Sequence, residues 1–548
     1  MSAAPPVVGA PPRAALIDSM ISVDHKAIAK RLLGFSLLFF LAGGVMALLM
    51  RAELAEPGLQ IVSTETYNAL FTMHGSTMIY LVITPLSLAL GLYMVPLQVG
   101  AAGVAAPRVA LSGLWLFVVG GLIMEAGWLT VGGPGRATWI GVAPLSELQR
   151  TPGSGQDFWI IGVLLATLGE WLIGMCILAT ALLKRAPGMT LMRMAPFTWT
   201  MVGTTLMMIF AFPVLIVLMG LLFYDRRNCC LFDGPQGPLS YQELFWFYGH
   251  PVVYVMFFPF VGAVAEVFSA FSGRRLFGYA FFVASTALLF AALSSSVWGH
   301  HMFTTGRINA KYFALTSHAI ILAAGLEYFD LIGTLWRGRI RLSAALLFGV
   351  TFLLQFLIGG LSGIWVASPT LDFNANNSYV VVGHFHYTLF AGSVFGAFAA
   401  IFYWFPKWTG AFLREGLGKV QLVIMFIGTN MTFAPMFALG EDGMTRRIAN
   451  YSAASGWETL NQIATIGSYL IALGVLAFLL NLYVSLRRRR SAGDDPWEGP
   501  SLEWATSSPP PPHNFDALPP IRTFAPLVDA REAAEDLQRG RAAEGLPA

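Results

Sequence analysis

The chain has 548 residues, of which 56% are hydrophobic and only 11% are charged. Its mean hydropathy is positive, which excludes an ordinary water-soluble globular domain and is typical of a protein that crosses a membrane several times. The net charge of +3 gives no indication of a nucleic-acid partner. We therefore expect the lipid bilayer to surround most of the chain.

The predicted elements are about twelve apolar stretches, each long enough to cross a hydrocarbon core of ~30 Å. In chain order they cover residues 32–50, 67–96, 109–131, 158–182, 198–223, 244–270, 276–297, 311–334, 341–366, 379–405, 420–440 and 464–487. This pattern predicts an all-α polytopic membrane protein whose membrane domain covers residues 32–488.

The two ends differ from this domain in composition. Residues 1–31 are Pro- and Ala-rich without an apolar core, so we expect a cytoplasmic N-terminal segment and no cleavable signal peptide. Residues 489–548 are polar, with four consecutive prolines from Pro509 to Pro512. This composition predicts a cytoplasmic tail that is disordered or lies against a partner.

Basic residues predict the orientation of the spans. If the N-terminus lies inside, the connections on that side carry most of the lysines and arginines. They are Lys184, Arg185, Arg193, Arg274, Arg275, Arg337, Arg339, Arg341, Lys407, Arg414, Lys419 and Arg487 to Arg490. We therefore expect both termini to be cytoplasmic, in a multi-pass protein of a bacterial-type cytoplasmic (inner) membrane.

Six of the nine histidines fall at one depth of this predicted topology. They are His74, His250, His300, His301, His384 and His386. Four lie in the first two turns of spans that run from outside to inside, and the adjacent pair follows the outer end of the seventh span. Ionisable residues within a bilayer are costly and usually functional, and imidazole suits iron and copper. A single one of these histidines is more often a packing residue, as we expect for His318, but six at one depth indicate metal ligation.

The spacing of the histidines assigns them to three metals. His384 and His386 are two residues apart, which on an α-helix separates them by roughly 200°, so one helix can bind a haem on each side. His74 can supply the second axial ligand of one haem, and the other haem keeps an open face for a substrate. His250, His300 and His301 remain, and three imidazoles are a typical copper ligand set. Tyr254 is four residues after His250, so both side chains face the same way, and its phenol could give a proton and an electron to dioxygen.

These residues lie in strings that resemble subunit I of the haem–copper oxygen reductases, of the cytochrome c oxidase and quinol oxidase type. The strings include Gly249 to Tyr254, Val297 to Phe303, Gly383 to Tyr387, Asp24 to Lys26, Arg51 to Leu54, Arg185 to Thr190, and Gly443, Met444, Arg446 and Arg447. The resemblance covers about residues 22 to 488.

The resemblance implies a fold of twelve helices in three arcs that hold two haems and one copper ion. It implies that His74 and His386 bind the low-spin haem, that His384 binds the high-spin haem, and that His250 is joined covalently to Tyr254. It further implies that Arg446 and Arg447 pair with haem propionates. Arg51 would lie beside the low-spin haem and Trp298 beside the copper, with haems of the A type.

The sequence departs from the family where protons are carried. Val252 replaces a glutamate that ends one proton route, and Gly103 replaces the aspartate at its start, with Ala110 and Cys176 in place of two asparagines. In the second route Glu327 replaces a lysine and Ala324 a threonine. Asn376 and Asn377 replace a magnesium-binding His-Asp pair. Candidates for a different route are Glu170, Glu266, Tyr248, Ser317, His318 and Glu327.

We therefore expect the catalytic subunit of a respiratory terminal oxidase that reduces dioxygen to water, with proton pumping weakened or rewired. The expected partners are other oxidase subunits, including a copper-bearing subunit through which electrons enter, and cytochrome c or quinol as donor. A nitric oxide reductase of the same superfamily would need an added glutamate ligand and no tyrosine at position 254. A non-catalytic haem-binding paralogue would not need all six histidines, and a secondary transporter would need none of them.

Overall fold

The structure is a computed structural model that describes residue 18, residues 20–229 and residues 231–543. Twelve of its helical segments are long and apolar enough to cross a membrane, and each of the twelve predicted stretches falls on one of them. Nine of these twelve spans are each built on one α-helix. The helices are α2 (His25–Glu53), α5 (Pro107–Ala126), α6 (Gly155–Leu183), α7 (Pro196–Asn228), α8 (Gly237–Ser272), α11 (Ala310–Leu335), α12 (Ala344–Val366), α16 (Glu415–Glu441) and α17 (Glu458–Arg487).

The other three spans are broken into shorter pieces. The second consists of α3 (Thr64–Ser76), a π-helical segment (Thr77–Ile83) and α4 (Thr84–Gln98). The seventh consists of α9 (Tyr279–Val283), a π-helical segment (Ala284–Phe290), α10 (Ala291–Ser294) and a 3₁₀ segment (Trp298–Thr305). The tenth consists of α14 (Tyr379–Phe385), a π-helical segment (His386–Val394) and α15 (Phe395–Thr409). Each broken span carries predicted metal ligands, and π-helical turns are frequent at functional sites.

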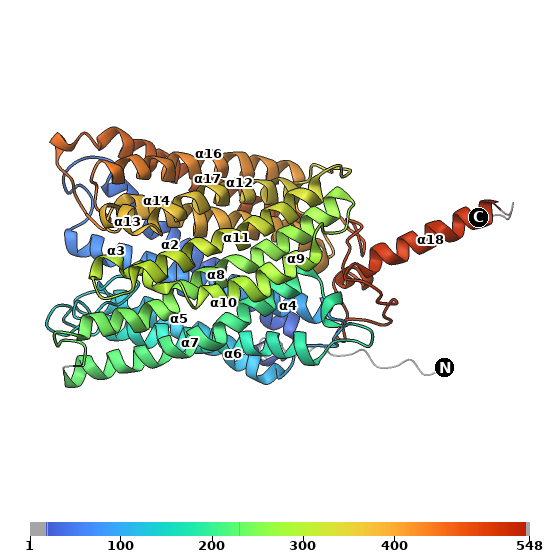
Figure 1. Cartoon of the computed structure of the whole chain (residues 1–548), viewed down its shortest axis with the longest axis horizontal. Helices are drawn as coiled ribbons and strands as arrows, with labels where there is room; N and C mark the ends of the chain where they lie inside the picture. Colours follow the sequence, from blue (N-terminus) through green and yellow to red (C-terminus); the bar gives the residue numbers. More distant parts are fainter. Residues whose placement is uncertain (1–17, 19, 230, 544–548) are drawn as a thin grey trace, which may run out of the picture.

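Neighbouring helices run side by side along the long axis of the bundle (Figure 1). Small residues let some of them approach closely, as between α5 and α6, where a Cβ at Gly120 would lie 2.7 Å from the carbonyl oxygen of Gly162. Such contacts are typical of helices that pack in lipid, where burial of apolar side chains gives no advantage over contact with lipid tails. Large apolar side chains at the periphery, such as Phe210 and Leu361, are more than half exposed, as a lipid-facing surface requires.

The two ends of the bundle are built differently. At one end, α3, α14 and the short helix α13 (Pro369–Ala375) lie together, and we call this the histidine end (Figure 1). At the opposite end, which we call the tail end, the C-terminal helix α18 (Pro526–Ala543) projects away from the bundle (Figure 1).

The tail differs from the sequence-based expectation of disorder. The tail segment, which we define as residues 491–525, lies against the tail end of the bundle and buries Leu502, Glu503, Trp504 and Asn514 almost completely. Lys407 at the end of α15 donates to the carbonyl oxygens of Asp494, Thr506 and Ser507. Because an extended Pro-rich chain can satisfy its backbone with side-chain donors of the bundle, a polar composition was not sufficient to predict disorder here.

Candidate metal centre

Three imidazoles form a cluster between α8 and the seventh span. His250 comes from α8, and His300 and His301 come from the 3₁₀ segment that follows α10. One possible ligand atom from each ring lies within 4.8 Å of the others. The His250 Nδ1 and His301 Nε2 atoms are 3.1 Å apart, and His250 Nε2 is buried without a hydrogen-bond partner in the part of the chain that is described. Converging nitrogen atoms with an unsatisfied lone pair fit a copper or other borderline metal ion.

The ring of His300 is fixed by Ser317 on α11. The two side chains are hydrogen-bonded at 2.7 Å through His300 Nδ1, and the Ser317 hydroxyl donates its one proton to the carbonyl oxygen of Phe313. The serine oxygen must therefore accept from an N–H at Nδ1, because a hydroxyl has only one proton to give. That tautomer leaves His300 Nε2 with a free lone pair, as metal binding requires.

His384 and His386 point to different sides of their span, as predicted. His384 Nδ1 lies 3.1 Å from both the Gly359 carbonyl oxygen and Ser362 Oγ of α12. The ring of His386 instead stacks on Phe433 of α16 at 4.3 Å, and its Nδ1 is 2.9 Å from the Val382 carbonyl oxygen. In each ring a fixed Nδ1 leaves Nε2 available to a metal.

Their neighbours differ accordingly. His384 is within electrostatic range of His250 and His300, whereas His386 is within range of His74. The Nδ1 of His74 is held at 2.8 Å by the Gly43 carbonyl oxygen of α2. The six histidines therefore form two groups. One group is His384 with the three cluster histidines, and the other is the pair His74 and His386.

Tyr254 lies beside the cluster, with its ring centroid 4.8 Å from that of His250. The aromatic ring that covers the cluster is Trp246, which stacks on His301 at 3.9 Å. Trp298 packs on Phe313 and Phe247. Sequence reasoning missed Trp246, although its position four residues before His250 on the same helix could have indicated a shared face.

Arginine side chains at the histidine end have unused donors. Arg51 donates through Nη2 to the Asn461 carbonyl oxygen and side chain, but its Nε and Nη1 atoms are buried without a partner among the described residues. Donors left over in a buried guanidinium fit an acceptor on a bound group. Neither Asn461, which accepts from Arg51, nor Phe433, which stacks on His386, was predicted, because no motif in the sequence indicates either residue.

Arg446 and Arg447 follow α16 in a loop that is partly buried. Burial and the neighbouring Arg447 lower the pKa of Arg446 to about 9, and Asp372 acts in the opposite direction. Arg447 adopts a left-handed backbone conformation with φ of 71°, which is uncommon for a residue with a side chain and often marks a functional position. Neither arginine has an ion pair within the described ranges, so a pair of carboxylates would fit there.

The residues predicted to carry protons fall into separate places. Glu170 of α6 is buried and both of its oxygens are without a partner among the residues described, and it is within electrostatic range of Tyr248. Glu327 of α11 is buried near Asp330 and Ser285. Ser317 belongs to the metal cluster through His300. His318 bonds Ala314 and Ser368 through its two ring nitrogens, as expected for a structural histidine.

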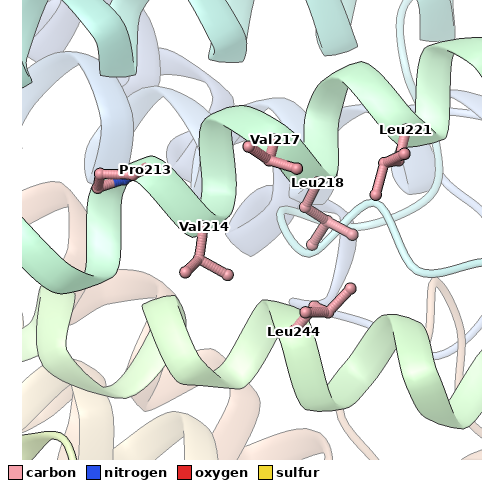
Figure 2. A pocket seen from close by; sticks show the side chains of 6 residues that line it. All are labelled: Pro213, Val214, Val217, Leu218, Leu221 and Leu244. Atoms are coloured by element: carbon pink, nitrogen blue, oxygen red, sulfur yellow. The ribbon is translucent and has the colours of Figure 1, made fainter.

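Two of the residues that, by the resemblance, replace proton carriers of the family have no group that can relay a proton, namely Val252 and Gly103. Val252 is fully buried, and a Cβ at Gly103 would lie 4.0 Å from His25 Cδ2. An apolar hollow of about 290 Å³ between α7 and α8 is lined by Pro213, Val214, Val217, Leu218, Leu221 and Leu244 (Figure 2). None of these side chains can ligate a metal or carry a proton, so the hollow offers no further metal or proton site.

Comparison with known proteins agrees with this geometry. Residues 27–470 match the family described as "Cytochrome C and Quinol oxidase polypeptide I". The chain is 44% identical over 519 residues to a putative cytochrome c oxidase subunit 1-beta of Streptomyces coelicolor, covering 94% of this chain and 90% of that protein. It is also 44% identical to cytochrome c oxidase subunit 1 of Corynebacterium efficiens, covering 93% and 88% of the two chains.

A solved structure of a heme-copper terminal oxidase dimer has the same fold, with a TM-score of 0.74, 19% sequence identity and 84% of each chain covered. The family implies haem and copper as cofactors, other oxidase subunits as partners, and a multi-pass location in a membrane. The chain belongs to the cytochrome c and quinol oxidase polypeptide I family and is the catalytic subunit of a terminal oxidase.

Proposed function

We propose that this subunit reduces dioxygen with electrons from cytochrome c, which reach it through a partner subunit that carries copper. The donor is supported by the names of the relatives in Streptomyces and Corynebacterium, which are cytochrome c oxidases. His74 and His386 would hold a low-spin haem, His384 would hold a high-spin haem, and His250, His300 and His301 would hold one copper ion. Both haems are of the A type.

The observation that carries the proposal is the convergence of three imidazole ligand atoms within 4.8 Å, with His384 in electrostatic range of two of them. When bound, the haems and copper supply electron transfer and the binding of dioxygen. The protein residues have other tasks. Ser317, Gly359, Val382 and Gly43 orient the imidazoles through Nδ1, and Tyr254 holds a proton on its phenol oxygen beside the cluster.

Three arginines would bind and orient the haems. Arg51 has unused Nε and Nη1 donors that would serve the low-spin haem, and Arg446 and Arg447 would pair with haem carboxylates. A guanidinium matches a carboxylate in shape and charge, so these contacts would also fix the haem planes.

The orientation we propose puts the tail end in the cytoplasm and the histidine end outside. It is supported by the basic residues at the tail end, among them Arg274, Arg275 and Arg337. In a bacterial cell this corresponds to the cytoplasmic membrane, with residues 1–31 as an N-terminal segment, residues 32–488 as the membrane domain and residues 489–548 as a cytoplasmic tail.

The purified complex provides the test. We expect a pyridine haemochrome of the A type with two haems per catalytic subunit, carbon monoxide binding to one of them, and rapid oxygen consumption with reduced cytochrome c. Replacement of His300 with alanine should remove one copper per complex and leave the copper of the partner subunit in place. Oxygen consumption with quinol alone would overturn the assignment of cytochrome c as the electron donor. Nitric oxide reduction without oxygen reduction would overturn the proposed reaction.

A further inference from the structure

Two buried carboxyl groups from distant parts of the chain meet at the tail end. Glu266 lies in the last two turns of α8, and Glu503 lies in a short 3₁₀ turn of the tail segment (Leu502–Ala505). Both are fully buried. The side-chain amide of Gln98, at the end of α4, donates to both through Nε2, at 3.5 Å to Glu266 Oε1 and 3.1 Å to Glu503 Oε1. The tail segment therefore completes a site that the membrane helices alone leave open.

The remaining contacts fix the orientation of this site. Thr198 Oγ1 donates to Gln98 Oε1 at 2.8 Å, so the amide presents its two N–H groups to the two glutamates. Ser501 of the tail donates to Glu266 Oε2 at 2.9 Å, and Trp404 donates to Glu503 Oε1 at 3.1 Å. Glu503 Oε2 has no partner among the residues that the structure describes. One carboxyl is thus bound by donors at one oxygen and unsatisfied at the other.

A proton shared by Glu266 and Glu503 would reduce both their mutual repulsion and the cost of the unsatisfied Glu503 oxygen. Two carboxylates within reach of one amide and removed from water repel each other, so the pair favours a singly charged form that shares one proton. Burial raises the pKa of Glu503, although its hydrogen bonds with Gln98 and Trp404 oppose the shift. A proton on Oε2 would also lower the cost of leaving that oxygen without a donor.

The charged and titratable groups around the pair come from three elements. Lys407 and Tyr403 of α15 are within electrostatic range of Glu503, Tyr279 of α9 is within range of Glu266, and Asp494 and Asp495 of the tail act on Lys407. The Lys407 ammonium is bound to three backbone carbonyl oxygens of the tail rather than to either glutamate. The pair therefore has no ion-pair partner in Lys407, and a shared proton would relieve the repulsion between its two carboxylates.

Polar groups continue from the pair into the bundle. Thr200 of α7 faces Gly262, one turn from Glu266 on α8, where a Cβ would collide with its hydroxyl. Thr204, four residues further along α7, shares that helix face. Its hydroxyl is buried and has no partner in the described part of the chain. A proton that leaves the pair would meet hydroxyl groups rather than only apolar side chains.

We propose that Glu266 and Glu503, bridged by Gln98, form a proton-holding pair that takes protons from the cytoplasm and passes them inward for dioxygen reduction. Each transfer moves one proton from water at the tail end to the pair and onward, with no change of oxidation state. The C-terminal tail is therefore a part of the proton-uptake machinery. The proposal rests on the oxidase function and on the orientation given above.

The test compares single variants of the full complex. Glu503→Gln and Glu266→Gln keep the shape and the hydrogen-bond acceptor but cannot hold the proton. We expect both to slow oxygen consumption by at least about tenfold at alkaline pH, with a smaller effect at acidic pH, where protons are abundant. Haem spectra and copper content should stay native. Glu503→Asp should recover most of the rate and of the native pH profile.

The matched control is Glu498→Gln, which removes an exposed acid of the same tail that pairs with Arg341 at 3.6 Å. It should keep the native rate and pH profile. Native rates and profiles in both glutamine variants would overturn the proposal, as would Glu503→Asp being as slow as Glu503→Gln. If the glutamine variants fail to assemble, the aspartate variant decides. A redox-sensitive infrared band of a protonated carboxyl should then shift in Glu503→Asp, and an unshifted band overturns the pair. Absence of oxygen consumption in the native enzyme would instead contradict the oxidase function.

Discussion

The Ser317 hydroxyl determines which nitrogen of His300 can bind metal, because its only proton is given to the Phe313 carbonyl oxygen. Ser317→Ala should therefore weaken copper binding by about 10- to 100-fold, as loss of an outer hydrogen bond to a metal-bound histidine commonly does. The measurement is the copper remaining on the complex across a chelator titration.

Ser362→Ala is the matched control for that prediction. His384 Nδ1 keeps the Gly359 carbonyl oxygen as a partner when Ser362 is lost, so this variant should retain its copper and change its haem spectrum only slightly. Equal copper loss in both serine variants would mean that Ser317 acts through packing rather than through the tautomer of His300.

Loss of a cluster ligand should remove the copper without affecting the low-spin haem. His250→Ala, His300→Ala or His301→Ala should each remove the copper of this subunit and reduce oxygen consumption to background, since two imidazoles hold copper much more weakly than three. The low-spin haem spectrum should persist because His74 and His386 lie in a different group. A copper-free variant with full activity would contradict the assignment.

The two sides of the tenth span give a paired prediction. His386→Ala should lose the low-spin spectrum, because the pair His74 and His386 would be broken. His384→Ala should lose carbon monoxide binding, because that ring faces the copper cluster. Visible spectra of the reduced enzyme with and without carbon monoxide distinguish the two, and exchanged outcomes would mean that the haems are assigned to the wrong sides.

At the scale of single elements, α11 carries two candidate functional residues on different turns. Ser317 is hydrogen-bonded to His300, and Glu327 lies about three turns further along the helix, buried near Ser285 and Asp330. Glu327→Gln should slow oxygen consumption by roughly 10²-fold if this carboxyl relays protons, with haem and copper contents unchanged.

Tyr328→Phe controls for disturbance of the same helix. It removes a hydrogen bond of 2.8 Å to the Leu353 carbonyl oxygen of α12 and no acidic group. This variant should turn over at the native rate. Native turnover of Glu327→Gln, measured beside it, would remove Glu327 from the proton path.

The helical spans were predictable because their apolar length is set by the bilayer, and the spacing of His384 and His386 was predictable because helix geometry is regular. The interruptions were not. The seventh span, predicted as one stretch over residues 276–297, contains π-helical and 3₁₀ turns, and residue composition carries no signal for where such turns begin. Trp246 was not predicted because the resemblance indicates Trp298, and a tryptophan four residues before a histidine is not by itself a motif.

At the scale of the whole molecule, the tail was the least predictable part. Its Pro-rich composition indicates disorder, but Leu502 and Trp504 are buried apolar side chains. Glu503 accepts hydrogen bonds from Gln98 of α4 and Trp404 of α15. Those partners are about 100 or more residues away in sequence, so only the folded bundle brings them together. On the proposed route, proton uptake depends on the tail segment as well as on the membrane helices.

Energy conversion is the last prediction at this scale. By the resemblance, Gly103, Val252 and Glu327 are expected to stand where the family carries protons, and a fully buried valine cannot hold or relay a proton. We therefore expect weakened pumping: the complex in sealed vesicles should release fewer protons per electron than relatives with both routes, while oxygen consumption remains rapid. The measurement is external acidification after a small pulse of reduced cytochrome c, with a protonophore control to separate pumping from scalar proton uptake. A full pumping yield would contradict a weakened pump and would require a rewired path, for which Glu266, Glu503 and Glu170 offer the buried carboxyls.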